Sequence, residues 1–99
     1  MSDEVASFKL DTGEEIIGRI TSRNPHNNTI VISKPRALAL MPGQAPGQMT
    51  IQLVPFMASD QDGDITVFDA HIVAQGKPAS DLEKGYLQNT SGIEIAGSL

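Results

Sequence analysis

The sequence predicts a mainly β protein with one small domain, and three observations lead to this prediction. Apolar residues recur at every second position over most of the first three-quarters of the chain, which is the period of a strand with one buried face. Glycine, proline and asparagine cluster between these segments, as they do in hairpin turns. With 99 residues, the chain is also too short for two ordinary domains.

The first two predicted strands form a hairpin. Apolar and polar residues alternate over residues 6–10, and Gly13 supplies the positive φ that the following tight turn needs. Beyond the turn, Ile16, Gly18 and Ile20 share one face of a long second strand. We expect one side of this strand to be mostly buried.

Three further strands are predicted, at residues 29–33, 49–55 and 64–73. The first of them is a β-branched run typical of a central strand. Lys34 and Pro35 break or bend it, and we expect residues 36–41 to continue it beyond the bend. The last strand is expected to kink near Asp69.

The alternation fades from Gly76 onward. Ser80-Asp81-Leu82-Glu83 has the form of a capping box, which predicts a short C-terminal helix over about residues 81–88. So short a helix needs docking on the rest of the protein to be stable. Residues 89–99 are expected to form a tail, in which Ile93–Ile95 could add a short strand to an open edge.

Composition excludes several classes of protein. The chain has no cysteine, so it has neither disulfides nor thiolate metal sites, and its net charge of −5 argues against a protein that coats polyanions through a basic surface. No run approaches the roughly 18 apolar residues of a membrane helix, and the acidic start does not resemble a secretory signal. We therefore expect a cytoplasmic protein without membrane contact, and self-association as a source of buried surface.

No motif nominates an enzyme. The nucleotide-binding patterns GxxxxGK and GxGxxG do not occur, nor does HExxH. Asp60, Asp62 and Asp64 cluster in an acidic turn, but glycine falls at the fourth position of this turn where an EF-hand loop has it at the sixth. We expect no catalytic residues, metal or cofactor, and interpret the turn as a solvated end of a strand. A small metal-dependent hydrolase using this turn is a distant third hypothesis.

One segment of the chain carries a family resemblance. Leu10–Ile20, with glycines at 13 and 18, resembles the first signature of the Sm and Sm-like family. The segment Asn24-Pro25-His26-Asn27-Asn28 then falls where that family has its first RNA-binding loop. By this resemblance Asn24 matches an Asp position, Asn27 the base-stacking position and Asn28 the base-reading Asn, with His26 beside them.

A second segment, Val67–Val73, more weakly resembles the family's second signature. Here Phe68 takes the position of an Arg and Asp69 that of a Gly, so the cation that faces phosphate in the family is missing. The resemblance covers about residues 5–75.

This resemblance implies a strongly bent, five-stranded antiparallel sheet that closes into a small open barrel over residues 1–75, with residues 76–99 as a C-terminal extension. It also implies a homo-oligomeric ring, in which the fourth strand of one copy pairs with the fifth of its neighbour. Edge pairing would satisfy backbone groups that a small open barrel leaves unpaired. Repetition of a weak site around one axis would add avidity for single-stranded RNA or DNA.

The candidate binding residues each have a second interpretation. The amides and imidazole at 24–28 could bind base edges, or they could cap the backbone of their own turn. Arg23 could meet phosphate; Lys34 and Arg36 are weaker candidates that we interpret as solvated charges at strand ends. Phe68 could stack on a base, although we favour a core position for an aromatic in a strand.

His71 is interpreted as a surface or interface histidine.

The first functional hypothesis is a ring-forming, non-enzymatic protein that binds single-stranded RNA or DNA through Arg23, the 24–28 loop and Phe68. The alternative hypothesis is a structural or protein-interaction module on the same barrel, which the net acidity and the missing Arg favour.

Overall fold

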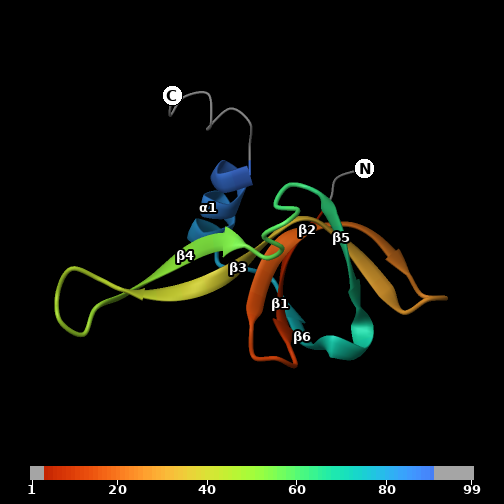
Figure 1. The fold of residues 1–99 in the computed structure, drawn as a ribbon, viewed down its shortest axis with the longest axis horizontal. Coiled ribbons are helices and arrows are strands. Elements are labelled where there is room, and N and C mark those ends of the chain that lie inside the picture. Colours follow the sequence, from red (N-terminus) through yellow and green to blue (C-terminus); the bar gives the residue numbers. More distant parts are fainter. Residues whose placement is uncertain (1–3, 91–99) are drawn as a thin grey trace.

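A computed structural model describes residues 4–90 of the chain. Its elements, in chain order, are β1 (Glu4–Leu10), β2 (Glu15–Asn24), β3 (Thr29–Pro42), β4 (Met49–Pro55), β5 (Asp64–Phe68), the short 3₁₀ helix η1 (Asp69–His71), β6 (Ile72–Gly76) and α1 (Ser80–Thr90) (Figure 1). The protein is mainly β with one C-terminal helix, as predicted. No helix within 4–90 is long and apolar enough to cross a membrane.

The strands form one antiparallel sheet. Its order is β4-β3-β2-β1-β6, and β5 pairs separately with β3. All five predicted strands are present, and the last is divided into β5 and β6 by η1, close to the kink expected near Asp69. The short helix η1 joins β5 to β6, and the bent sheet forms a small open barrel (Figure 1).

The long strand β3 changes partner halfway along. Its first part, Thr29–Ser33, pairs with β5, and its second part, from Arg36 to Pro42, pairs with β4. Lys34, between the two parts, has a left-handed backbone with φ of 49°. This conformation is costly for a residue with a side chain and marks the bend predicted at Lys34-Pro35.

The fourth predicted strand, β4, lies at the edge of the sheet and outside the closed part of the barrel. β4 pairs only with the outer half of β3, so these two segments form a two-stranded ribbon that projects from the barrel (Figure 1). The first part of β3 pairs with β2 along one edge and with β5 along the other, so β5 completes the barrel wall. We call residues 36–55 the ribbon.

The barrel interior is the main hydrophobic core. Ile16 and Ile20 lie in it, as the spacing predicted, together with one face of the neighbouring strands. Its buried members are Ala6, Phe8, Leu10, Ile16, Ile20, Ile30, Ile32 and Val67. Gly18 lies where the β2–β3 register shifts, and a methyl group there would overlap the Ile32 side chain. The strand can bend and pack closely at this point because glycine has no side chain.

The helix α1 covers the opposite face of β1 and β2. Val5, Ile17 and Tyr86 form a second buried cluster, against which Leu82 and two ribbon leucines pack. Ile17 is as completely buried as Ile16, so the expectation of one mostly buried face for β2 is incomplete. The helix, expected over 81–88, spans Ser80–Thr90 and packs on β1 and β2, which supplies the docking that so short a helix needs. The proposed strand at Ile93–Ile95 lies outside the described residues.

Candidate nucleic-acid interface

The two segments that carry the family resemblance lie side by side in the fold. The turn between β2 and β3 contains residues 24–28, and the β5–η1 junction contains Phe68 and Asp69. The backbone N–H of Asp69 donates a 2.9 Å hydrogen bond to the carbonyl of Asn28. Thr29 and Phe68 are paired residues of β3 and β5. Figure 1 shows the β2–β3 turn next to the β5–η1–β6 corner at one end of the barrel.

Phe68 is exposed, so the preference for a core position is wrong. Val67 points into the barrel and is 8% exposed, whereas Phe68, the next residue along the strand, is 58% exposed. Alternation along β5 places these two side chains on opposite faces. The sequence could not decide between the two positions because both residues are apolar. An exposed aromatic ring beside a polar turn can serve as a stacking surface.

The 24–28 turn is stabilised by one of its own asparagines. The side-chain oxygen of Asn24 accepts hydrogen bonds from the backbone N–H groups of His26 and Asn27, at 3.1 and 3.3 Å. Asn28 has a left-handed backbone with φ of 55°, which asparagine tolerates better than most residues. The backbone-capping interpretation is therefore correct for the Asn24 oxygen. The side chains of His26, Asn27 and Asn28 are exposed.

Arg23 lies at the end of β2, next to this turn. Its Nη2 donates a 3.1 Å hydrogen bond to Oε1 of Gln75 on β6. Arg23, Asp69, Ile72 and Gln75 line a shallow cavity of about 210 Å³. Sequence reasoning missed Gln75, because only the β1–β6 pairing brings that strand near Arg23. Asp69 places a negative charge beside the arginine, which weakens the local attraction for phosphate.

Lys34 and Arg36 do not belong to this surface, and their interpretation as solvated strand-end charges is wrong. Arg36 is 5% exposed. Its Nε donates a 2.7 Å hydrogen bond to Oδ1 of Asn89, and its Nη1 donates to the Gln61 carbonyl at 2.6 Å. Lys34 Nζ donates to the carbonyl of Thr90, at the end of α1. Arg36 thus holds both the helix and the acidic turn on β3, and the Lys34 side chain holds the end of the helix.

The acidic turn has a structural role. Oδ1 of Asp62 lies 3.2 Å from Nη2 of Arg36. Within residues 4–90, no group of three or more histidine or acidic side chains is arranged to hold a metal ion. The turn is attached to the buried arginine through the Gln61 carbonyl, and the exposed Asp62 adds a weaker ion pair.

His71 is an exposed member of η1. Its Nδ1 lies 2.8 Å from Oδ2 of Asp11 in the β1–β2 turn, and the two form an ion pair when the imidazole is protonated. Asp11 also donates its backbone N–H to the His71 carbonyl at 2.8 Å. These contacts attach η1 to the first hairpin, so His71 is a surface histidine with a structural contact.

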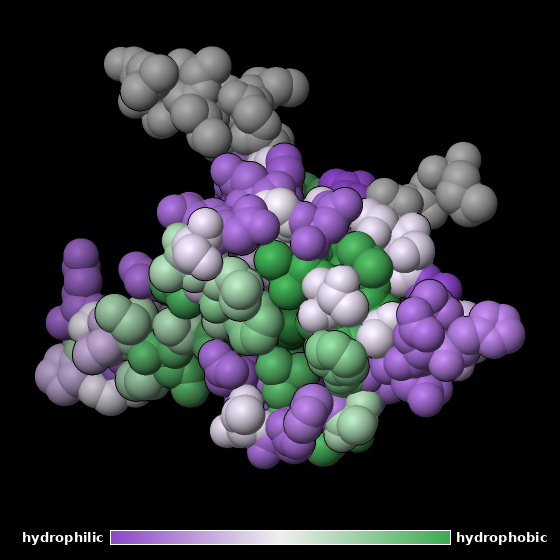
Figure 2. All heavy atoms as spheres, turned by 45° about the vertical axis from the view of Figure 1, so that its right-hand side comes forward, coloured by the Kyte–Doolittle hydropathy of each residue, from purple (hydrophilic) through white to green (hydrophobic). Residues whose placement is uncertain are grey.

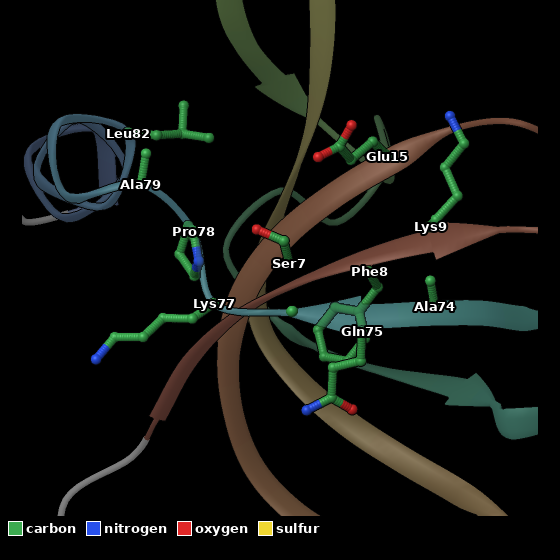
Figure 3. A pocket seen from close by; sticks show the side chains of 11 residues that line it. Ser7, Phe8, Lys9, Glu15, Ala74, Gln75, Lys77, Pro78, Ala79 and Leu82 are labelled. Carbon is green, nitrogen blue, oxygen red and sulfur yellow. The ribbon is translucent and has the colours of Figure 1, made fainter.

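Two larger cavities share single residues with this surface. One of about 430 Å³ is bounded by Phe8 and Gln75 on the strands and by Pro78, Ala79 and Leu82 on the way into α1 (Figure 3). A second, of about 330 Å³, is lined mainly by apolar residues and includes Phe68. The candidate site is the exposed end of the barrel, where the two segments of the family resemblance meet.

No model of a protein family matches the chain, and a search of curated proteins finds no match either.

Proposed function

We propose that the protein binds single-stranded nucleic acid, RNA or DNA, without catalysing a reaction. The site would comprise Arg23, the 24–28 turn and Phe68. The observation that supports it best is the adjacency of an exposed aromatic ring and a turn with exposed amide and imidazole side chains. A base can stack on the ring while amides donate to and accept from its edge.

A single copy of this site would bind weakly. Arg23 supplies a positive charge for phosphate, but Asp69 lines the same cavity. The whole chain carries a net charge of −5, so long-range attraction for a polyanion is absent. Useful affinity therefore requires several copies that act on one strand of nucleic acid.

We propose that these copies form a ring. Within residues 4–90, β5 pairs only with β3 and β6 pairs only with β1, so each has an edge without a backbone partner. The β5 edge of one copy can pair with the β6 edge of the next, which would satisfy these groups and repeat the site around one axis. The Sm-like resemblance of residues 5–75 implies the same kind of assembly.

Fluorescence anisotropy with labelled oligo-U, oligo-A and single-stranded DNA, at low and moderate salt, tests the binding. We expect salt-sensitive binding that Phe68→Ala weakens by about tenfold and Phe68→Tyr preserves, because tyrosine keeps a stacking ring. Equal affinities of the two variants, or no binding of any oligonucleotide, would contradict the proposal.

Light scattering tests the ring separately. Val73, on β6, is 63% exposed. A lysine on an edge strand hinders pairing with another chain, so Val73→Lys should reduce the particle mass, whereas the β-branched control Val73→Thr should keep it. A wild-type protein that is monomeric at high concentration would rule out the ring.

A protein-interaction module is the second candidate. Phe68 stands where the resemblance leads us to expect a cation, and Asp69 lies beside Arg23. Both features favour a protein partner over a polyanion. A ring that binds none of the oligonucleotides would support this candidate over the first.

A further inference from the structure

Beyond Arg36 at its base, the ribbon is free of charge. Residues 37–59 contain no Asp, Glu, Lys or Arg, and no other stretch of the chain without these residues is as long. The segment includes all of β4 and most of the outer half of β3. Exposed edge strands usually carry charged residues that prevent association with other chains. Such protection is missing here, which suggests that the ribbon makes a contact.

Beyond the Arg36–Pro55 pair at its base, one face of the ribbon is entirely apolar. Leu38 pairs with Leu53 and Leu40 with Ile51, so these four side chains lie on the same face, and Met49 continues it towards the tip. Leu38 and Leu53, near the barrel, pack against the cluster that includes Tyr86 of α1. We call the rest of this face, Leu40, Met49 and Ile51, the apolar ribbon face.

The apolar ribbon face is uncovered among the described residues. Leu40 is 67% exposed, Met49 56% and Ile51 51%. Figure 2 shows hydrophobic side chains along the projecting ribbon. A stripe that begins under a helix and continues into solvent is unusual for a protein that stays alone, since solvated apolar surface costs free energy.

A shallow groove runs beside this face. Leu40 and Ile51 line it on one side, and Lys9, Glu14 and Glu15 from the first hairpin line it on the other, around a volume of about 210 Å³. These charges lie at the margin of the apolar surface, as polar residues do at the rim of a protein interface. An occupant therefore meets an apolar centre and a charged rim.

We propose that the apolar ribbon face binds the same face of a second copy of this chain. Two copies each carry a net charge of −5 and repel one another, so close contact is least costly where the surface has no charge. The same patch on both copies can pack about a two-fold axis, the commonest symmetry of protein dimers.

A lipid bilayer is a poorer occupant for the ribbon. β4 pairs only with β3 among the described residues, so its outer edge presents backbone N–H and C=O groups without partners. These groups would lose their hydrogen bonds to water in hydrocarbon. In a dimer they can stay hydrated at the margin while the three apolar side chains are buried.

This contact is independent of the proposed ring. The ring would use the outer edges of β5 and β6, whereas the two-fold contact uses one face of β3 and β4. If both form, two rings would be joined through their ribbons. If the ring fails, the ribbon contact still predicts a dimer.

Single cysteines test the face directly, because the chain has no thiol of its own. Ile51→Cys places a thiol on the apolar ribbon face, and Gln52→Cys places one on the opposite face, since successive residues of a strand alternate. Under mild oxidation we expect covalent dimer from Ile51→Cys and little from Gln52→Cys. Equal cross-linking of the two variants, or none, would overturn the proposal.

Matched lysine variants test the association itself. Ile51→Lys should lower the particle mass in light scattering by a factor of about two, whereas Gln52→Lys, with the same added charge, should leave it unchanged. Circular dichroism during thermal unfolding checks that both variants fold. An unchanged mass in folded Ile51→Lys would overturn the proposal. If the wild type bound lipid vesicles, and Ile51→Lys lost this binding while its particle mass stayed unchanged, the proposal would also be overturned and the face would be assigned to lipid.

Discussion

The hydroxyl of Tyr86 donates a 2.7 Å hydrogen bond to the backbone carbonyl of Ser33 and so ties α1 to β3. The same oxygen accepts a 3.2 Å hydrogen bond from the backbone N–H of Arg19 on β2. Tyr86 is only 1% exposed, and its burial raises the pKa of the phenol above the usual value. One side chain of the C-terminal helix thus satisfies two backbone groups where β2 bends.

Tyr86→Phe should lower the free energy of unfolding by about 1–2 kcal/mol, because it leaves a backbone N–H and a carbonyl without this partner. Urea denaturation measures the loss. Leu87→Tyr is a suitable control, since Leu87 is partly exposed on the same helix and the change should have a small effect. A Tyr86→Phe protein as stable as the wild type would show that water replaces the hydroxyl at no cost.

The raised pKa of Tyr86 predicts a pH dependence. Since the unfolded chain loses the phenolic proton near the usual pKa of about 10, and the folded chain only at higher pH, the unfolded state binds fewer protons above that pH. This contribution to stability is therefore complete below about pH 10 and is lost as the pH rises towards the folded pKa. The stability difference between wild type and Tyr86→Phe, measured from pH 8 to 11, should shrink at the alkaline end. A constant difference would contradict this.

Gly18→Ala should destabilise the barrel by about 1–3 kcal/mol. The added methyl group would overlap the Ile32 side chain and would lie 3.4 Å from the Cα of Pro35. Gly85→Ala is the matched control, because a methyl group there meets no atom within 4 Å and alanine favours a helix. Thermal unfolding should therefore shift down for the first variant and slightly up for the second.

Arg36→Lys should cost about 1–3 kcal/mol although the charge is kept, because a lysine cannot reproduce the fork of hydrogen bonds to Asn89 and Gln61. Asp62→Asn should cost less than about 1 kcal/mol, since Asp62 is 74% exposed and such ion pairs are screened by solvent. Chemical denaturation compares the two. A larger loss from Asp62→Asn would mean that the ion pair dominates.

Variants of Asn28 separate its backbone role from its amide. The left-handed backbone at φ 55° suits glycine, so Asn28→Gly should keep the stability within about 1 kcal/mol, and Asn28→Ala should lose about 1–2 kcal/mol. Both lack the amide, so both should bind oligonucleotides less tightly than the wild type. Binding that is weakened only in Asn28→Ala would assign its effect to the backbone.

Much of the fold could be predicted from local pattern. Alternation and β-branched runs located the five predicted strands, the last of which is divided into β5 and β6. The conformational freedom of glycine explained the turn at Gly13, where φ is 95°. The division of partners along β3 could not be predicted, because both halves have the same strand periodicity. The burial of Arg36 depends on Asn89 and Gln61, which are distant in sequence.

The candidate site was predicted in part. The resemblance to the Sm-like family implied that residues 24–28 and Phe68 belong to one surface, and the pairing of Thr29 with Phe68 brings the two segments together. Val67 and Phe68 are apolar neighbours on β5, and the sequence could not show which of the two faces the interior. The contact between Arg23 and Gln75 required the β6 position, which no local signal in the sequence carries.

The change of partner at Lys34 couples the two halves of the molecule mechanically. One continuous strand forms part of the barrel wall and then one side of the ribbon, with a short bend between them. The ribbon therefore has no separate hinge, and the barrel wall sets its direction.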